Sequence, residues 1–248
     1  MTADFTGRTA LVTGSTSGIG REVARQLATR GAHVLVSGRD AERGAATVEA
    51  IRSSGGKADF IQADLADPAS VQQLAVRAIE LGGQVDILVN NAGLFPFAPT
   101  AEVPQQEFDE VYAVNVRAPF FLVQALAPAM AERGNGAIVN VTTMVATFGL
   151  AGAAVYGSSK AALQLLTKTW AAEFGAAGVR VNAVSPGPTR TEGTASMGSS
   201  LDGLATTTPL NRVGKPEEVA AGIVFLASDT AAQIHGVVLP VDGGRLAV

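Results

Sequence analysis

Tyr156 and Lys160 lie four positions apart in the segment Tyr-Gly-Ser-Ser-Lys. On a helix, this spacing places the two side chains on one face. A free tyrosine has a pKa of roughly 10, so it is a poor proton donor and a worse base at neutral pH. A nearby ammonium favours the phenolate and is expected to bring the pKa of Tyr156 down towards neutral pH. The pair therefore predicts a proton donor and the group that tunes it, although such a spacing also occurs in ordinary surface pairs.

A glycine-rich loop lies far upstream, at Gly14, Gly18 and Gly20, after a short apolar segment and before an amphipathic one. In such a loop the first glycine permits a tight turn, the second lets the backbone approach a pyrophosphate, and the third lets helix and strand pack closely. The N–H groups and the dipole at the start of the helix then attract phosphate. The loop predicts a dinucleotide site, and the alternative is a flexible strand–helix connection.

The composition excludes several classes of function. With 248 residues and no linker-like segment, the chain is expected to form a single domain over residues 1–248. Hydrophobic residues make up 47% of the chain and charged residues 16%, which supplies a large core. A net charge of −4 without a cluster of basic residues argues against nucleic acid as a partner.

Neither a metal site nor a membrane segment is expected. The chain has no cysteine, which rules out disulfides, thiol catalysis and cysteine-bound zinc, and its two histidines, His33 and His235, are far apart. The N-terminal residues form no basic and apolar signal, and no apolar run approaches the ~20 residues that cross a bilayer. We therefore expect a soluble cytoplasmic protein.

Short apolar segments alternate with amphipathic ones along the whole chain. Those that read as buried strands cover residues 8–13, 32–37, 58–63, 86–90, 137–142, 179–184 and 236–241. Helices are expected between them, one starting at Asp67-Pro68 and a long one over 104–132 with a kink at Pro119. This order predicts an α/β fold with a doubly wound, parallel, seven-stranded sheet and helices on both faces. Residues 189–209 are irregular and rich in Gly, Ser and Thr, and are expected to form a lid over the substrate.

The arrangement of motifs resembles the short-chain dehydrogenase/reductase family, and within it the 3-oxoacyl-thioester reductases. The segment that begins at Thr13-Gly14 has this family's glycine spacing, and further matches follow in order. They are Asn90-Asn91-Ala92-Gly93, Asn115, Tyr156 with Lys160, Ser185-Pro186-Gly187 and Val241-Asp242-Gly243-Gly244. The resemblance covers nearly the whole chain and implies a single-domain Rossmann fold, a nicotinamide cofactor, ketone–alcohol chemistry, and a homotetramer or homodimer.

The same resemblance implies a role for each residue of the catalytic set. Tyr156 donates a proton to the carbonyl oxygen or accepts one from the alcohol. Lys160 lowers the pKa of Tyr156 and binds the nicotinamide ribose, and Asn115 holds a water that links Lys160 to solvent. Thr143 stands where the family usually has serine; it keeps the hydroxyl but adds a methyl group beside the carbonyl. An ordinary packing role remains the alternative for both Asn115 and Thr143.

The end of the second expected strand indicates which nicotinamide cofactor is preferred. NAD-preferring relatives place an acid where this chain has Gly38, whereas Arg39 offers a planar cation suited to a 2′-phosphate. We therefore expect NADP(H) to be preferred over NAD(H), unless Arg39 pairs with Asp40 or Glu42. The remaining residues implied in cofactor binding lie in five segments: Gly14, Ser17, Gly18, Ile19 and Gly20; Asp64 and Leu65; Asn91, Ala92 and Gly93; Tyr156 and Lys160; Pro186, Gly187, Thr189 and Thr191.

Several readings of function remain open. The first is an NADP(H)-dependent oxidoreductase that interconverts a ketone and a secondary alcohol. The second is a catalytically silent nucleotide-binding regulator of the same fold, and a methyltransferase is a distant third. An acyl-carrier substrate is disfavoured because Ala176 and Ala177 stand where a basic docking residue would be expected. The substrate pocket is expected to be apolar, near Phe95, Phe97, Thr143, Val145 and Phe148.

Overall fold

Seven parallel strands form one sheet in the order β3-β2-β1-β4-β5-β6-β7. The computed structural model describes residues 4–248. The strands are β1 (Thr9–Thr13), β2 (His33–Gly38), β3 (Lys57–Gln62), β4 (Ile87–Asn90), β5 (Gly136–Val141), β6 (Val179–Pro186) and β7 (Val238–Val241). The predicted α/β fold with a doubly wound, seven-stranded parallel sheet is confirmed. β6 runs two residues further than expected because Ser185 and Pro186 pair with β7.

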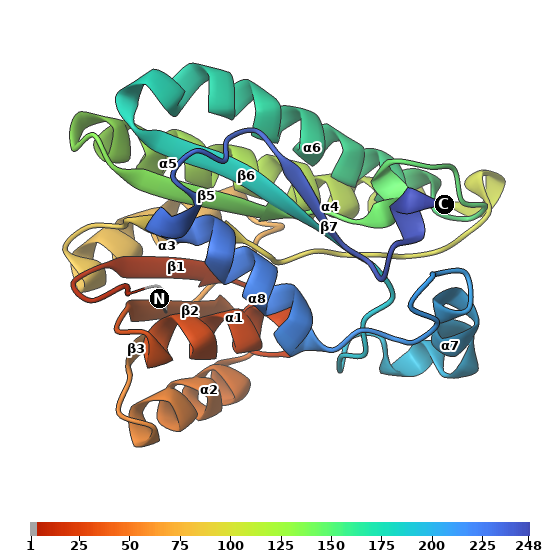
Figure 1. Ribbon diagram of the computed structural model, residues 1–248, viewed down its shortest axis with the longest axis horizontal. Coiled ribbons are helices and arrows are strands. Elements are labelled where there is room, and N and C mark those ends of the chain that lie inside the picture. Colours follow the sequence, from red (N-terminus) through yellow and green to blue (C-terminus); the bar gives the residue numbers. More distant parts are fainter. Residues whose placement is uncertain (1–3) are drawn as a thin grey trace.

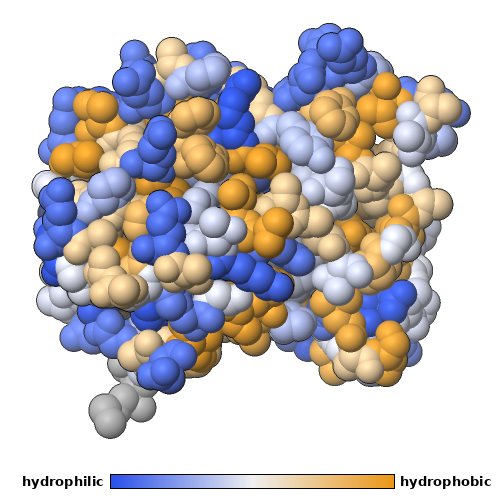
Figure 2. Space-filling view, turned by 90° about the horizontal axis from the view of Figure 1, so that it is seen from above, coloured by the Kyte–Doolittle hydropathy of each residue, from blue (hydrophilic) through white to orange (hydrophobic). Residues whose placement is uncertain are grey.

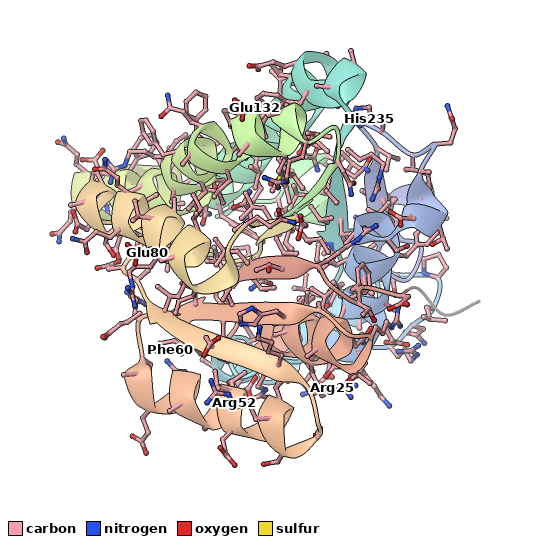
Figure 3. The ribbon with its side chains drawn as sticks, turned by 90° about the vertical axis from the view of Figure 1, so that its left-hand side faces the viewer. Arg25, Arg52, Phe60, Glu80, Glu132 and His235 are labelled. Carbon is pink, nitrogen blue, oxygen red and sulfur yellow. The ribbon has the colours of Figure 1, made fainter. Side chains whose placement is uncertain are left out.

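Helices cover both faces of the sheet (Figure 1). One layer is formed by α1 (Gly18–Thr29), α2 (Ala41–Ser53) and α8 (Pro216–Ala227); the other by α3 (Pro68–Gly82), α4 (Gln105–Tyr112), α5 (Ala118–Glu132) and α6 (Ala154–Phe174). Figure 3 shows the layers from the side, with Glu80 and Glu132 on one side of the sheet and Arg25 and Arg52 on the other. The short helix α7 (Ser199–Ala205) lies away from the sheet, beyond the C-terminal ends of the strands (Figure 1).

The core follows from the apolar strands β1, β2, β4, β5 and β6, which are buried on both faces. One hydrophobic cluster joins α1, α2 and α8 to the sheet and includes Val23, Ile51 and Ile223. The other joins α3, α5 and α6 to the opposite face and includes Leu74 and Leu122. Seen from the α6 side, the outer surface mixes hydrophobic and hydrophilic residues (Figure 2). A sheet packed on both faces holds the ends of its strands in fixed positions, and the site is built at those ends.

Local sequence signals explain where several helices begin. Asp40 caps α2 by accepting from the N–H of Arg43 at 3.0 Å. Asp67 caps α3 by accepting from Ala69 and Ser70, each at 3.1 Å, and Pro68 is the first helical residue. The predicted start at Asp67-Pro68 is confirmed, and capping of this kind satisfies N–H groups that the helix itself leaves free.

The long helix predicted over 104–132 is continuous but distorted. A π-helical stretch, Ala113–Arg117, separates α4 from α5, and the N–H of Ala118 donates to the carbonyl of Ala113. The predicted disturbance near Pro119 therefore lies just before the proline, because Pro119 has no N–H to offer the carbonyl of Asn115. Over its full length, Gln105–Glu132, this is the one helix of residues 4–248 long and apolar enough to cross a membrane. Half of its most apolar window is buried within the fold, as in a helix of a protein core.

The segment 189–209 is more regular than predicted. It contains a turn of 3-10 helix, Ala195–Met197, and then α7. An ion pair between Arg190 and Asp202, with 2.5 Å between nitrogen and oxygen, joins its two ends. The Gly, Ser and Thr content suggested an irregular loop, but Leu201 and Ala205 are buried, and this packing favours the helix.

Candidate active site

A cavity of about 470 Å³ lies at the C-terminal ends of the strands. The strand order reverses between β1 and β4, since the chain leaves β1 towards β2 on one side and continues from β4 towards β5 on the other. Open parallel sheets bind ligands at this switch point. The cavity is therefore where the topology predicts a site.

The glycine loop forms one wall of the cavity and is held to the segment after β4. The side chain of Asn91 donates to the carbonyls of Thr13 and Gly14, at 2.9 and 3.1 Å. A side chain at Gly20 would collide with the Gly14 carbonyl and with Asn91, and Gly14 has φ +62 with Ala92 directly against it. These positions need glycine because two backbone segments meet there.

The N-terminus of α1 opens into the same cavity. Ser17 precedes the helix, but its side chain makes no capping hydrogen bond, and the first turn holds no acidic residue. The N–H of Gly18 donates instead to the carboxylate of Glu192 at 3.0 Å, and Arg21 forms an ion pair with the same carboxylate at 2.5 Å. The start of α1 therefore has an anion-binding character that its own sequence does not satisfy.

Arg39 lines the cavity at the end of β2 and is exposed. Asp40 pairs with Arg43 at 2.8 Å, and Arg39 has no ion pair among residues 4–248. The alternative in which Asp40 engages Arg39 is therefore not the arrangement found. Asp64 and Leu65 line the same end of the cavity, after β3.

Tyr156 and Thr143 meet at the centre of the cavity. Burial raises the pKa of Tyr156 above its ordinary value, and a hydrogen bond with the Thr143 hydroxyl opposes that rise. This rise in the pKa of Tyr156 is opposite to the fall that was predicted from the charge of Lys160. Tyr156 therefore holds its proton at neutral pH more firmly than free tyrosine does.

Lys160 is buried, with 3% of its surface exposed, and lies one helical turn from Tyr156. Its ammonium donates to the carbonyl of Val141 at 2.8 Å. Burial lowers the pKa of Lys160 to about 8, because the charged form has lost most of its water. A lysine with this pKa is only partly charged near pH 8, which weakens its field at Tyr156.

Asn115 lies outside the cavity wall and is fully buried in the π-helical stretch. Its side chain exchanges hydrogen bonds with the backbone of Leu94, accepting from the N–H and donating to the carbonyl, both at 2.8 Å. It also donates to the hydroxyl of Ser159 at 3.0 Å. These bonds fix the loop after β4 against α6 and engage both N–H donors of the side chain.

A group of apolar side chains lines the cavity on the side of Tyr156 where Phe95 and Phe97 lie, and we call this group the outer pocket. Its wall consists of Phe95, Phe97, Val145, Leu150, Met197, Leu201 and Leu204. The rings of Phe95 and Phe97 lie 6.2 and 6.1 Å from that of Tyr156, centroid to centroid. Phe148, which was expected here, lies outside the cavity wall, where Arg245 covers its ring at 4.5 Å.

The structure brings the sequence-predicted residues together. Every predicted cofactor residue lines the one cavity, as do Thr143, Tyr156 and Lys160, whereas Asn115 supports it from behind. Leu94 and Ser159 were not predicted from sequence, and no single residue among Glu192 and the residues of α7 was singled out within the predicted lid. Glu192 stands next to Thr191 in sequence, but no local pattern reveals that it reaches a helix that begins 174 positions earlier. The glycine loop, the N-terminus of α1 and the size of the cavity fit a bound dinucleotide.

Comparison with known proteins points to one family. Residues 14–245 match the family model described as Enoyl-(Acyl carrier protein) reductase. A D-threitol dehydrogenase from Mycolicibacterium smegmatis is 40% identical, covering 96% of this chain and 92% of the relative. A solved short chain dehydrogenase/reductase family protein is 51% identical with a TM-score of 0.92, covering 99% of this chain and all of its own. A blue fluorescent protein from a metagenomic library, solved with NADPH, is 36% identical with a TM-score of 0.93, covering 98% and 99%.

Proposed function

Since this chain belongs to the short-chain dehydrogenase/reductase family and is an NAD(P)-dependent oxidoreductase of that family, we propose that it interconverts a ketone and a secondary alcohol with NADP(H). The observation that carries the proposal is the meeting of Tyr156, Thr143 and Lys160 in the one cavity that also holds the glycine loop. The bound cofactor supplies or receives a hydride.

Tyr156 gives its proton to the carbonyl oxygen during reduction and takes it from the alcohol in reverse. The raised pKa keeps the Tyr156 hydroxyl protonated at neutral pH, and the charge of Lys160 favours release of that proton to the substrate oxygen. The Thr143 hydroxyl, which lies beside that of Tyr156, is the second group that binds the substrate oxygen. Two donors on one oxygen stabilise the negative charge that develops there.

Lys160 binds the nicotinamide ribose and stabilises the phenolate form of Tyr156 through its charge. Its pKa of about 8 lets it take up and release protons near neutral pH. A water on the backbone carbonyl of Asn115 links this exchange to solvent. Support for that role comes from Pro119, which leaves the Asn115 carbonyl without its usual helical donor.

NADP(H) is preferred because Arg39 is exposed at the rim of the cavity and is not neutralised by Asp40. An arginine fork matches a 2′-phosphate, whereas Gly38 offers no carboxylate to hold two ribose hydroxyls. The NADPH complex of one solved relative supports the same preference.

The working unit is proposed to be a cytoplasmic homotetramer or homodimer in which residues 189–209 form the lid. Phe120 and Phe121 on α5 are 41% and 44% exposed, and Leu165 on α6 is 67% exposed, which leaves apolar surface for a second copy to cover. Trp170 on α6 is 4% exposed and belongs to the core. A monomer by light scattering would contradict this part of the proposal.

A panel of ketones and secondary alcohols, followed through the absorbance of NADPH, tests the function. We expect turnover in wild-type protein, a higher kcat/KM with NADPH than with NADH, and no turnover above background in Tyr156→Phe. Binding of NADPH without turnover across the panel would instead favour a silent nucleotide-binding regulator. A preference for NADH would overturn the proposed cofactor.

A further inference from the structure

The outer pocket differs from the rest of the cavity in having no charge. The charged side chains that line the cavity are Arg39, Arg43, Asp64 and Lys160, and none of them belongs to the outer pocket. A carboxylate or phosphate on the substrate would therefore lose its water without meeting a partner.

The hydroxyls near the outer pocket are already committed to the protein. Thr142 donates to the carbonyl of Val184 at 3.1 Å, and Thr194 donates to that of Thr189 at 2.9 Å. Among these four hydroxyls, those of Thr143 and Tyr156 donate to no backbone carbonyl of residues 4–248, so they are placed to donate together to one substrate oxygen. Each further buried hydroxyl would lack a partner, which costs about tenfold or more in affinity.

The two phenylalanines supply apolar surface that the protein itself leaves uncovered. Phe95 and Phe97 are 38% and 46% exposed, and their planes are inclined by 60° and 62° to the ring of Tyr156. These are the separations and tilts at which aromatic groups attract one another. A flat or cyclic group attached to the reacting carbonyl would lie against the same two rings.

We propose that the substrate is an uncharged, apolar ring compound, a cycloalkyl or aryl ketone or the matching secondary alcohol, and not a polyol, sugar acid or other highly hydroxylated molecule. This inference rests on the proposed function. It narrows that function from ketones in general to those that carry one polar group and a ring.

The test compares kcat/KM at saturating NADPH for 4-methylcyclohexanone, acetophenone, fructose and 5-ketogluconate. We expect the ring ketones to exceed the two hydroxylated ketones by at least a hundredfold. A preference for fructose or 5-ketogluconate would overturn the substrate class while the proposed function stood. Turnover of no ketone at all would overturn the proposed function.

Variants separate the pocket from the chemistry. Phe97→Ala is expected to raise KM for acetophenone about tenfold and to change that for butanone by less than threefold, because butanone has no ring to lose its contact. Phe148→Ala, which removes a ring outside the cavity, is the matched control and should change neither. An equal rise for both ketones in Phe97→Ala would contradict the role of the ring.

A second inference comes from a different observation, the carboxylate at the start of α1. Glu192 belongs to the lid, yet it accepts from the N–H of Gly18 and pairs with Arg21. The helix brings no capping side chain of its own to this place. A pyrophosphate would need the same N–H groups and the same end of the helix dipole.

We infer that Glu192 competes with the cofactor pyrophosphate, so that the lid must release α1 before a dinucleotide binds. Two anions at one helix N-terminus repel each other, and Arg21 cannot neutralise both. Cofactor binding and movement of residues 189–209 are then coupled through one side chain.

Titrations without any substrate test this competition. Glu192→Gln is expected to tighten the binding of NADPH and ADP about tenfold and to leave adenosine, which has no phosphate, unchanged. Asp202→Asn is the matched control, since it removes the other ion pair of the lid without touching α1, and should stay within twofold of wild type. Unchanged or weaker ADP binding in Glu192→Gln, or an equal gain in Asp202→Asn, would overturn the inference.

Discussion

The two halves of the cavity are built from different parts of the chain. The cofactor half consists of backbone turns at the ends of β1 to β4, where hydrogen bonds such as those of Asn91 fix one loop on another. The outer pocket consists of side chains from three distant segments, and α7 supplies Leu201 and Leu204. Because the cofactor half is built from backbone, it can bind the same dinucleotide in proteins of different sequence. The outer pocket is built from side chains, so substitutions there can change which substrate binds.

The comparison also explains why Tyr156 lies where it does. It stands on α6 at the boundary, with Lys160 on the cofactor side and Phe95 and Phe97 on the substrate side. Changes in the cofactor half should therefore alter binding of NADPH for every substrate, and changes in the outer pocket should alter only the choice of substrate.

The largest effect is expected from adding a side chain to the glycine loop at Gly20. In Gly20→Ala the new methyl group would overlap the Gly14 carbonyl and Asn91, so we expect NADPH to bind at least a hundredfold more weakly. The free energy of unfolding should fall by about 2 kcal/mol. Gly203→Ala on α7 is the control, because nothing lies within 4 Å of the added methyl; its NADPH titration should match wild type. Equal affinity of the two variants for NADPH would contradict the assignment of the cofactor to the half that contains the glycine loop.

The next effect concerns the second donor at the substrate oxygen. Thr143→Ala should lower kcat/KM about a hundredfold, the lower end of the usual loss for a donor that stabilises an oxyanion. Thr143→Ser keeps the hydroxyl and should stay within a few-fold of wild type. Steady-state kinetics on the preferred ketone decide this, and undiminished activity in the alanine variant would remove Thr143 from the mechanism.

A somewhat smaller effect is expected at the adenosine end. Arg39→Ala should lower kcat/KM for NADPH by about tenfold to thirtyfold, the loss of a charge-assisted hydrogen bond, and leave NADH within twofold. Arg43→Ala should cost less, since Arg43 is already paired with Asp40. Parallel loss of NADPH and NADH efficiency in Arg39→Ala would mean that Arg39 does not read the 2′-phosphate.

The smallest effect is on stability and changes sign with pH. The pKa of Lys160 falls from 10.5 to about 8 on folding, so the charged form costs the folded state about 3 kcal/mol below pH 8, and this cost disappears above about pH 10.5. Lys160→Met removes the cost but leaves the carbonyl of Val141 without its donor, a loss of about 2 kcal/mol. We expect the variant to be inactive yet about 1 kcal/mol more stable at pH 7.

Urea unfolding across pH measures this difference. The advantage of Lys160→Met should shrink as pH rises above 8 and become a disadvantage near pH 10. If Lys160→Met were less stable than wild type at pH 7, the charged form of Lys160 would not destabilise the folded state by the stated free energy.

The sequence predicted the cofactor half far better than the outer pocket. The positions of the strands, the glycine loop and the cap at Asp67 follow from local patterns, because their physical cause lies within a few residues. Glu192 on α1 and the apolar face of α7 depend on how distant segments pack, and no local pattern contains that information. The raised pKa of Tyr156 was not predicted for the same reason, since the burial that causes it is not visible in the spacing of Tyr156 and Lys160.

The most direct test of the account is to measure two quantities on Tyr156→Phe, the dissociation constant of NADPH and the rate of ketone reduction in a single turnover. Because Tyr156 is assigned to the proton and the glycine loop to the cofactor, we predict a dissociation constant within threefold of wild type and a rate at least a thousandfold lower. A rate close to wild type would contradict the central claim that Tyr156 is the proton donor.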